Sequence, residues 1–296
     1  MIAVVDYQKG NLKSVERGLI AAGGEAFITA DASEIAKADA IVLPGVGAFA
    51  DAATTMCELG QMEAIRDRVR AGVPFLGICL GEHLMFEHGV EGAPEGNPAC
   101  GLGLLPGTVV AMPRCDAQGK TFKVPHVGWN TIEMPACNGG AAVPSCGEGG
   151  GNAVLKQSSL RCGTARGTSP DSAAQPGSEL AFACPLFDGI APGEYFYFTH
   201  SYIAPTGSHT IAETTHSTRF TSAVQFGECA FGVQFHPEKS SDAGARVLAN
   251  FVALAARGSA VATPMSDRNA EACSCSLQSK SWMAAPCAAP KGTIPR

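Results

Sequence analysis

Residues 73–81 read VPFLGICLG, an apolar run that leads into a cysteine with a glycine two places away on each side. The apolar run predicts a buried strand and the residues from Leu80 to about His88 predict a helix, so Cys79 lies at the turn between them. At such a nucleophile elbow, larger side chains in place of Gly77 and Gly81 would collide. The N-terminus of a helix favours thiolate over thiol, so we predict that Cys79 is a catalytic nucleophile. The alternative is a small buried hydrophobic residue, the usual role of a free cysteine.

The segments before and around this elbow alternate between strand and helix patterns. The first hundred residues predict short apolar strands and amphipathic helices, and this alternation is typical of a parallel sheet covered by helices on both faces. The strands are expected at Ile2–Asp6, Ala26–Thr29, Ala40–Leu43 and Val73–Ile78, and the helices at Asn11 to about Ala22 and at Glu58–Ala71.

After Gly101 the pattern changes to strands joined by turns, which indicates a mixed or antiparallel extension of the sheet. A final helix from Asp242 to Arg257 closes the domain. We therefore predict an α/β fold with an open, mixed, mostly parallel sheet flanked by helices. The later strands are expected at Thr108–Met112, Lys120–Val124, Tyr195–Ile203, Thr210–Thr215, Ser222–Phe226 and Phe231–Phe235.

Two segments lack periodicity and are rich in small residues. Residues 135–181 consist largely of Gly, Ser, Ala and Cys, and residues 258–296 have few large apolar side chains. Neither segment can bury enough apolar surface to order itself. We predict a flexible low-complexity insertion (135–181) within a domain that spans residues 1–257, followed by a disordered tail at 258–296.

Composition excludes several classes of protein. The net charge of −6 gives no reason to expect a nucleic-acid or anionic-membrane partner, and no apolar run approaches the roughly 20 residues of a membrane span. The N-terminus has no basic segment or cleavage site of a signal peptide, so we expect a cytoplasmic protein. Twelve cysteines in 296 residues then indicate neither a disulfide scaffold nor a zinc site, and we interpret the closely spaced Cys273 and Cys275 as incidental.

A second segment supplies a base for the cysteine. Residues 231–240 read FGVQFHPEKS, where an apolar strand delivers His236 at its carboxyl end and Pro237 stops the strand. Glu238 can then turn back to hold the imidazole. The order Cys79, His236, Glu238 predicts a triad whose third member orients the base and stabilises the imidazolium.

A third segment supplies donors for an oxyanion. Residues 43–49 read LPGVGAF, a glycine-rich loop at the end of a strand. In open α/β sheets such loops surround the site, so we predict that main-chain N–H groups near Val46 and Gly47, together with that of Leu80, form the oxyanion hole. The alternative is a phosphate cradle, but no Gly-Lys-Ser/Thr follows.

These segments resemble the class I, triad-type glutamine amidotransferases, and within that family they are most similar to the glutaminase subunits of imidazole glycerol phosphate synthase. The blocks at residues 10–12 (GNL) and 125–130 (PHVGWN) separate these subunits from other members of the class. The resemblance covers most of residues 1–257 and implies a flavodoxin-like domain. Its segments are residues 6–7, 10–12, 14–15, 44–49, 77–81, 124–130, 200–202 and 231–240.

The resemblance implies a reaction and a partner. Cys79 would attack the side-chain carbonyl of L-glutamine, and His236 would protonate the departing ammonia and then activate the water that hydrolyses the thioester. The ammonia would pass to a cyclase subunit, a (β/α)₈ barrel in this family, for the synthesis of imidazole glycerol phosphate in histidine biosynthesis. The implied assembly is a heterodimer with this cyclase, without a metal or an organic cofactor.

The resemblance also implies binding residues. We expect contacts to glutamine from five residues of the loops around Cys79, and contacts to the cyclase from four residues elsewhere. The glutamine set is Gly45, His83, His200, Ser201 and Tyr202, and the cyclase set is Asn11, Trp129, Tyr197 and Lys239.

The chain departs from the family directly after the elbow. The family usually continues Met-Gln, whereas this chain continues Glu82-His83. That glutamine helps to bind the substrate, and we expect the imidazole of His83 to replace one hydrogen bond. A carboxylate at Glu82 would oppose thiolate formation if it lay close to Cys79. Two alternatives remain: a glutaminase of another class I amidotransferase, and a non-catalytic regulatory binding subunit.

Overall fold

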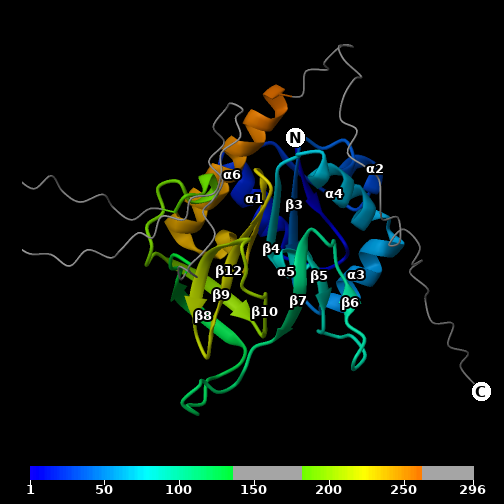
Figure 1. The fold of residues 1–296 in the computed structure, drawn as a ribbon. Coiled ribbons are helices and arrows are strands. Elements are labelled where there is room, and N and C mark those ends of the chain that lie inside the picture. Colours follow the sequence, from blue (N-terminus) through cyan, green and yellow to red (C-terminus); the bar gives the residue numbers. More distant parts are fainter. Residues whose placement is uncertain (136–181, 262–296) are drawn as a thin grey trace, which may run out of the picture. The chain divides into compact units, whose positions relative to one another are not determined.

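A mixed sheet of seven strands carries the elbow on a middle strand (Figure 1). The strand order is β11-β12-β13-β4-β3-β1-β2. The five strands from β2 to β13 pair in parallel, and β13, β12 and β11 pair antiparallel, which confirms the predicted open, mostly parallel sheet. The strands are β1 (Ile2–Val5), β2 (Ala26–Thr29), β3 (Ala40–Gly45), β4 (Phe75–Cys79), β11 (Thr210–Thr215), β12 (Arg219–Phe226) and β13 (Ala230–Val233).

This structure is a computed structural model that describes residues 1–135 and 182–261, with side chains as far as Arg257. Residues 136–181 of the predicted insertion and residues 262–296 of the predicted tail lie outside the described residues. The last helix, α6 (Ser241–Val261), continues beyond Arg257, where we expected the domain to end. Within the described ranges, no helix combines the length and the apolar character needed to cross a membrane.

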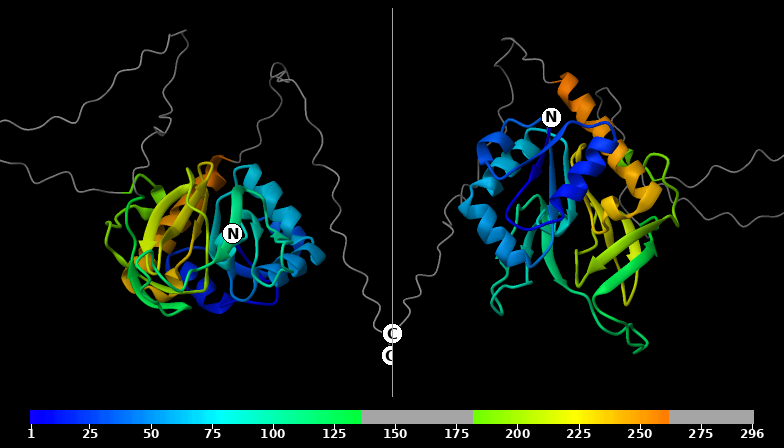
Figure 2. Two further views of the ribbon diagram at one scale, coloured as in Figure 1. Left: turned by 60° about the horizontal axis from the view of Figure 1, so that its bottom comes forward. Right: turned by 180° about the vertical axis from the view of Figure 1, so that it is seen from behind.

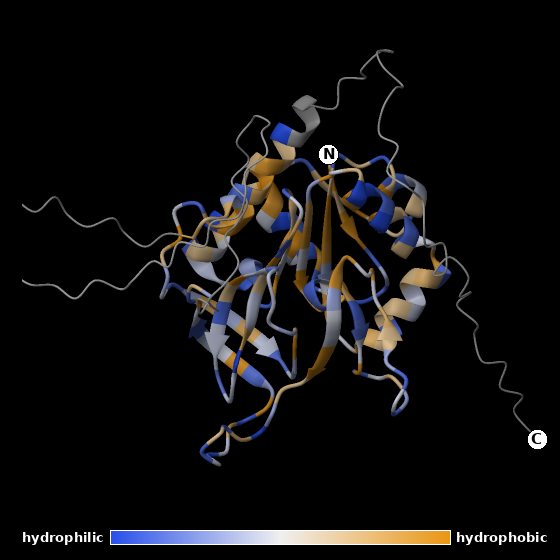
Figure 3. Ribbon diagram, viewed as in Figure 1, coloured by the Kyte–Doolittle hydropathy of each residue, from blue (hydrophilic) through white to orange (hydrophobic). Residues whose placement is uncertain are grey.

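Helices cover both faces of the central sheet (Figure 2). Alternate residues of β1 point to opposite faces: Ile2 and Val4 pack with residues of α1 (Leu12–Ala21) and α6, and Ala3 and Val5 pack with the other helices. Figure 3 shows the hydrophobic residues concentrated along these strands, as expected for a parallel sheet that is buried on both sides. The helices of the second face are α2 (Ala32–Ile35), α3 (Phe49–Glu58) and α4 (Gln61–Arg70).

The predicted extension of the central sheet was wrong for two of its segments, because they form separate sheets. A four-stranded sheet has the order β10-β7-β5-β6, and a two-stranded sheet pairs β8 with β9. The segment expected as one strand from Tyr195 to Ile203 breaks at Ser201, since its two halves pair in different sheets. These strands are β5 (Phe86–Gly89), β6 (Ala99–Cys100), β7 (Leu105–Ala111), β8 (His126–Thr131), β9 (Tyr195–His200) and β10 (Tyr202–Ile203).

Three element boundaries also differ from the prediction. The helix after the elbow, α5 (Leu80–His83), ends before β5 because that segment pairs with β7. The helix expected at Glu58–Ala71 begins only at Gln61, after Gly60, whose φ of 69° is left-handed, and Glu58 is the last residue of α3, a helix that was not predicted. The strand expected at Lys120–Val124 forms only one isolated bridge, between Thr121 and Cys115.

Candidate active site

Cys79 occupies a strained turn between β4 and α5. Its φ of 54° and ψ of −106° lie outside the regions that L-residues usually adopt. A Cβ on Gly77 would lie 2.5 Å from the carbonyl oxygen of Gly81, and a Cβ on Gly81 would overlap the carbonyl oxygen of Leu43. The two glycines therefore permit the turn, as the elbow required.

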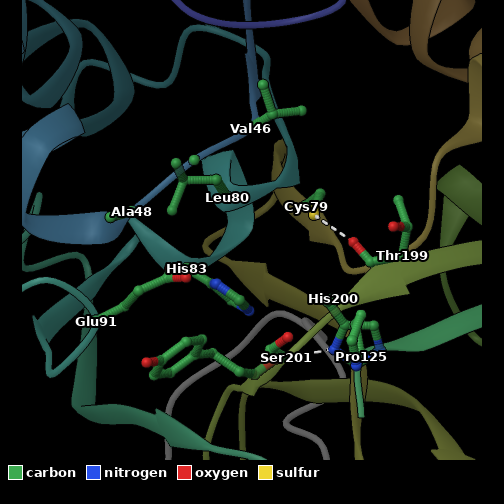
Figure 4. A pocket seen from close by; sticks show the side chains of 12 residues that line it. Val46, Ala48, Cys79, Leu80, His83, Glu91, Pro125, Thr199, His200 and Ser201 are labelled. Carbon is green, nitrogen blue, oxygen red and sulfur yellow. Dashed lines mark hydrogen bonds between the residues drawn. The ribbon is translucent and has the colours of Figure 1, made fainter. Parts of the chain in front are cut away.

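The thiol of Cys79 opens onto a cavity of about 500 Å³ (Figure 4). The cavity lies among the loops that follow β3 and β4 and the segment from β9 to β10. Seven residues with an expected role besides Cys79 line it: Val46, Gly47, Leu80, His83, His200, Ser201 and Tyr202. The remaining lining residues are Ala48, Glu91, Pro125 and Thr199.

Gly45, expected to contact substrate, is not one of the residues that line this cavity. A Cβ at this position would overlap the hydroxyl of Tyr7 and would lie 2.8 Å from the Cβ of Leu80. Tyr7 is fully buried, and burial raises the pKa of its phenol above the usual value. Gly45 therefore serves the close packing of β3 against the elbow.

His236 and Glu238 form a buried pair. Their side chains are 2 % and 1 % exposed, and His236 Nδ1 lies 2.9 Å from Glu238 Oε1. The other ring nitrogen, Nε2, is buried and has no hydrogen-bond partner. Burial alone would lower the pKa of His236, but Cys79 and Glu238 outweigh it and raise this pKa to about 9. Burial would likewise raise the pKa of Glu238, yet its bond to His236 holds that pKa below the usual value.

His83 reaches Cys79 through Gln234. His83 Nε2 lies 2.8 Å from Gln234 Oε1, and Gln234 Nε2 donates to Cys79 Sγ at 3.8 Å. An amide oxygen only accepts, so His83 Nε2 carries the proton. Burial lowers the pKa of His83 to about 4, which leaves the ring neutral at physiological pH.

Glu82 is a buried carboxyl group of α5. Its side chain is fully buried against β13, where a Cβ on Gly232 would lie 2.7 Å from Glu82 Cγ. Neither carboxyl oxygen has a hydrogen-bond partner, and burial raises the pKa of Glu82 well above its usual value. Burial therefore favours the neutral form of the Glu82 carboxyl, and α5, with four residues, adds only a short helix dipole at Cys79.

The four residues expected at the cyclase interface lie near the buried pair and on the β8–β9 sheet. Asn11 Nδ2 donates to Glu238 Oε1 at 3.4 Å. Trp129 and Tyr197 are opposite each other in the β8–β9 register, with ring centroids 6.1 Å apart, and Lys239 Nζ lies 5.9 Å from the Tyr197 ring centroid. Trp129 is 51 % exposed, which is unusual for a large aromatic residue.

Sequence reasoning missed several residues of this site. Glu91 is the acidic side chain of the cavity wall, and burial raises its pKa. Gln234 lies within the quoted segment of His236 but had no assigned role. Glu91 and Thr199 belong to no motif, so only the fold could bring them to Cys79.

The described residues contain no group of three or more His, Cys, Asp or Glu side chains that could hold a metal ion. None of the described cysteines forms a disulfide: these are Cys57, Cys79, Cys100, Cys115, Cys184 and Cys229. Of these six cysteines, Cys79 is the one that lines the cavity.

A cysteine elbow beside a buried His–Glu pair, on a mixed sheet of this order, defines a class of enzyme. The model of the family described as "Glutamine amidotransferase class-I" matches residues 3–255, and the chain belongs to this family. The chain is similar to the imidazole glycerol phosphate synthase subunit HisH of Moorella thermoacetica, with 38% identity over 84% of this chain and 93% of that protein. The subunit of the same name from Rhodopirellula baltica is 36% identical over 85% of this chain and 96% of that protein.

Solved structures agree with the fold. A glutamine amidotransferase crystal structure matches with a TM-score of 0.53 and 17% identity, over 86% of this chain and all of that chain. PurLQS from Thermotoga maritima matches with a TM-score of 0.51 and 15% identity, over 85% of this chain and 97% of that chain. At these identities the likeness concerns the fold alone.

Proposed function

We propose that the chain is the glutaminase subunit of an imidazole glycerol phosphate synthase, which hydrolyses L-glutamine and delivers the ammonia to a cyclase subunit. The observation that supports the hydrolysis of glutamine is the buried His236–Glu238 pair beside an elbow cysteine that opens onto a cavity. The names of the HisH relatives support the synthase. A chain that depends on the free thiol of Cys79 belongs in a reducing compartment, and we place it in the cytoplasm.

Cys79 and His236 supply the nucleophile and the acid. The pKa of about 9 for His236 keeps its ring protonated near neutral pH, where an imidazolium stabilises the thiolate. The thiolate attacks the amide carbonyl of glutamine, His236 protonates the departing ammonia, and a thioester remains on Cys79. Water, deprotonated by the now neutral His236, hydrolyses this thioester to glutamate.

The cavity walls supply the oxyanion donors and the substrate contacts. Main-chain N–H groups of Leu80 and of the Val46–Gly47 segment are the donors that we assign to the tetrahedral intermediate, since these residues line the cavity beside Cys79. Glu91 is the residue that we assign to the α-ammonium group of glutamine, because a carboxylate can accept hydrogen bonds from this positively charged group. His83, whose Nε2 is engaged by Gln234, keeps only Nδ1 as a hydrogen-bond acceptor for a substrate.

The β8–β9 sheet and its neighbours form the surface that we assign to the cyclase. Exposed Trp129 stacks edge-on against Tyr197, and Lys239 follows Glu238 directly in sequence. Asn11 contacts Glu238 itself. A partner that docks here would lie against residues that touch the pair responsible for proton transfer, so ammonia could leave the site without crossing bulk water.

Glutamate release from glutamine tests this proposal. The purified chain is assayed alone, with its cognate cyclase, and with the cyclase plus its ribotide ligand, and Cys79→Ala is the control. We expect turnover that needs the cyclase, rises with the ligand and disappears in Cys79→Ala. A complex that forms but never releases glutamate would show that the chain is a binding subunit.

A further inference from the structure

A series of hydrogen bonds runs from β8 to the wall of the cavity. His126 and His200 are opposite each other in the β8–β9 register, and His126 Nδ1 lies 3.0 Å from His200 Nε2. On one side, Asn130 Nδ2 lies 3.2 Å from His126 Nε2. On the other side, His200 Nδ1 lies 2.8 Å from the carbonyl oxygen of Tyr202. We name this series the histidine relay.

The partners at the two ends determine where each proton lies. The Tyr202 carbonyl only accepts, so His200 Nδ1 carries a proton and donates it. The Asn130 amide nitrogen also donates to the Thr215 carbonyl at 3.0 Å, so an N–H₂ group, not an oxygen, faces His126 Nε2. His126 Nε2 is therefore the acceptor, and the one proton of a neutral His126 lies on Nδ1, from which it is donated to His200 Nε2.

Burial favours this neutral arrangement. His126 and His200 are 4 % and 6 % exposed, and burial lowers the pKa of His126 to about 4 and that of His200 well below its usual value. The His126 ring is also held on both faces. It stacks on Phe198 with centroids 5.0 Å apart and on His216 with centroids 4.3 Å apart, so it has little freedom to turn.

We propose that His126 is a positioning residue of the glutamine pocket, whose Nδ1 donor holds the His200 ring in place and thereby holds the wall formed by Ser201 and Tyr202. Both ring nitrogens of His200 are engaged in the relay, so the part that we assign to His200 is to support this wall rather than to bind glutamine through its ring. The consequence for catalysis rests on the proposed glutaminase function, whereas the proton positions do not.

The donor from His126 matters because it is the partner of Nε2, the ring nitrogen of His200 that does not bond Tyr202. Without that donor, Nε2 of the buried His200 ring is left unsatisfied, and the ring is held only by the bond from Nδ1 to the Tyr202 carbonyl. The ring can then turn, and Ser201 and Tyr202 are held less firmly in the cavity wall. Cys79 and His236 are not members of the relay, so the expected loss is in glutamine binding and not in the chemical step.

Nitrogen-15 NMR of the full chain with labelled histidine tests the proton positions, whether or not the chain has any glutaminase activity. Signals are assigned with His126→Asn and His126→Gln. We expect a protonated Nδ1 and a bare Nε2 at both His126 and His200 at neutral pH. A proton on Nε2 of either ring would overturn the proposal.

A matched pair of variants tests the consequence for glutamine binding, in the presence of the cyclase. The amide of His126→Asn can place its N–H₂ near the position of Nδ1, whereas the amide of His126→Gln reaches the position of Nε2 and leaves His200 without its donor. We expect KM for glutamine to rise about tenfold in His126→Gln, with kcat within about twofold, because a buried hydrogen bond is lost. In His126→Asn we expect KM to remain within about threefold of the parent.

His209→Gln is the control, since His209 Nε2 bonds the Pro205 carbonyl outside the relay, and its KM should equal that of the parent. Equal KM values for His126→Asn and His126→Gln, or a fall in kcat alone, would contradict a positioning role. If the parent chain itself releases no glutamate under any condition, the proposed function fails, and the NMR result alone then decides the tautomers of the relay.

Discussion

The imidazole of His236 and the carboxylate of Glu238 are joined by a 2.9 Å hydrogen bond, although only one residue, Pro237, separates them in the chain. Pro237 starts a short 3₁₀ helix directly after His236, and this turn brings the carboxylate back onto Nδ1. The bond leaves Nε2, the opposite ring nitrogen, free to serve Cys79. Because both side chains are buried, water cannot substitute for either partner.

Glu238→Gln should therefore lower kcat by about 100-fold or more, since general acid–base catalysis contributes about 10²–10⁴ and needs the correct tautomer of His236. KM should change little, because Glu238 does not line the cavity. Steady-state glutamate release with the cyclase present measures both. Glu87→Gln, in which an exposed carboxylate of β5 is changed, is the control, and a normal kcat in Glu238→Gln would rule out the pair as the source of the proton.

The pH dependence follows from the pKa of about 9 for His236. This value is raised above the usual one, so the protonated ring stabilises the fold fully below about pH 6.5, and that contribution is lost as the pH rises through about 9. We expect kcat/KM to fall above about pH 9, as the imidazolium that pairs with the thiolate is lost. A pH–rate profile checks this. In Glu238→Asp the carboxylate is farther from Nδ1, so the pKa of His236 should be lower, and the alkaline decline of the residual activity should begin at a lower pH than in the parent chain.

Gly81→Ala tests the elbow through stability. The new Cβ would overlap the carbonyl oxygen of Leu43, which belongs to buried β3 and cannot move aside. We expect a loss of about 3 kcal/mol or more in the free energy of unfolding, measured by urea denaturation. Gly119→Ala is the matched control: it has a φ of 81° but open space around it, so only the left-handed backbone should cost about 1 kcal/mol. Equal losses at both positions would contradict the steric account.

His83 is the departure from the family that the structure makes testable. His83→Ala leaves the buried Gln234 amide without its partner, and we expect kcat/KM for glutamine to fall about tenfold, the cost of one unsatisfied hydrogen bond. His83→Gln, which restores the usual family residue, should stay within about threefold of the parent. His88→Ala changes a histidine outside the cavity and should leave kcat/KM unchanged. A larger loss in His83→Gln than in His83→Ala would mean that the imidazole has a role of its own.

Trp129→Ala tests the surface assigned to the cyclase. Buried aromatic anchors dominate many protein interfaces, so we expect Kd for the cyclase to rise about 30-fold, corresponding to about 2 kcal/mol. Titration calorimetry measures Kd, and the thermal midpoint of the isolated chain should not change, because half of this side chain is exposed. Val110→Ala, at an exposed position of β7, is the control. An unchanged Kd in Trp129→Ala would remove this residue from the interface.

The central sheet was predictable because its parallel strands can be recognised from local sequence patterns. β1, β3 and β4 are continuous apolar runs separated by helix-length segments, and such alternation permits few arrangements. The two smaller sheets were not predictable in the same way. Whether β9 pairs with β8 or joins the central sheet depends on contacts between segments far apart in the chain, and Ser201 gives no sign that a strand changes sheets there.

The site shows the same division between local and distant evidence. Cys79, His236 and Glu238 stand in short motifs whose chemistry can be recognised, and the fold brings the elbow and the His–Glu pair together. Glu91 lies in an unremarkable turn after β5, so no pattern marked it as part of the cavity wall. Glu82 shows a further limit: the sequence marks its carboxyl as a charge near Cys79, but only the structure shows that burial against Gly232 favours its neutral form.

Trapping of the covalent intermediate tests the central claim most directly. The complex with the cyclase and its ligand is mixed with glutamine, quenched in acid during turnover and digested for mass spectrometry. The chain has twelve cysteines, so the position of the adduct is informative. We predict a glutamyl thioester on the peptide that contains Cys79, and none in Cys79→Ala. Glutamate release that continues in Cys79→Ala, or a thioester on any other cysteine, would contradict the account.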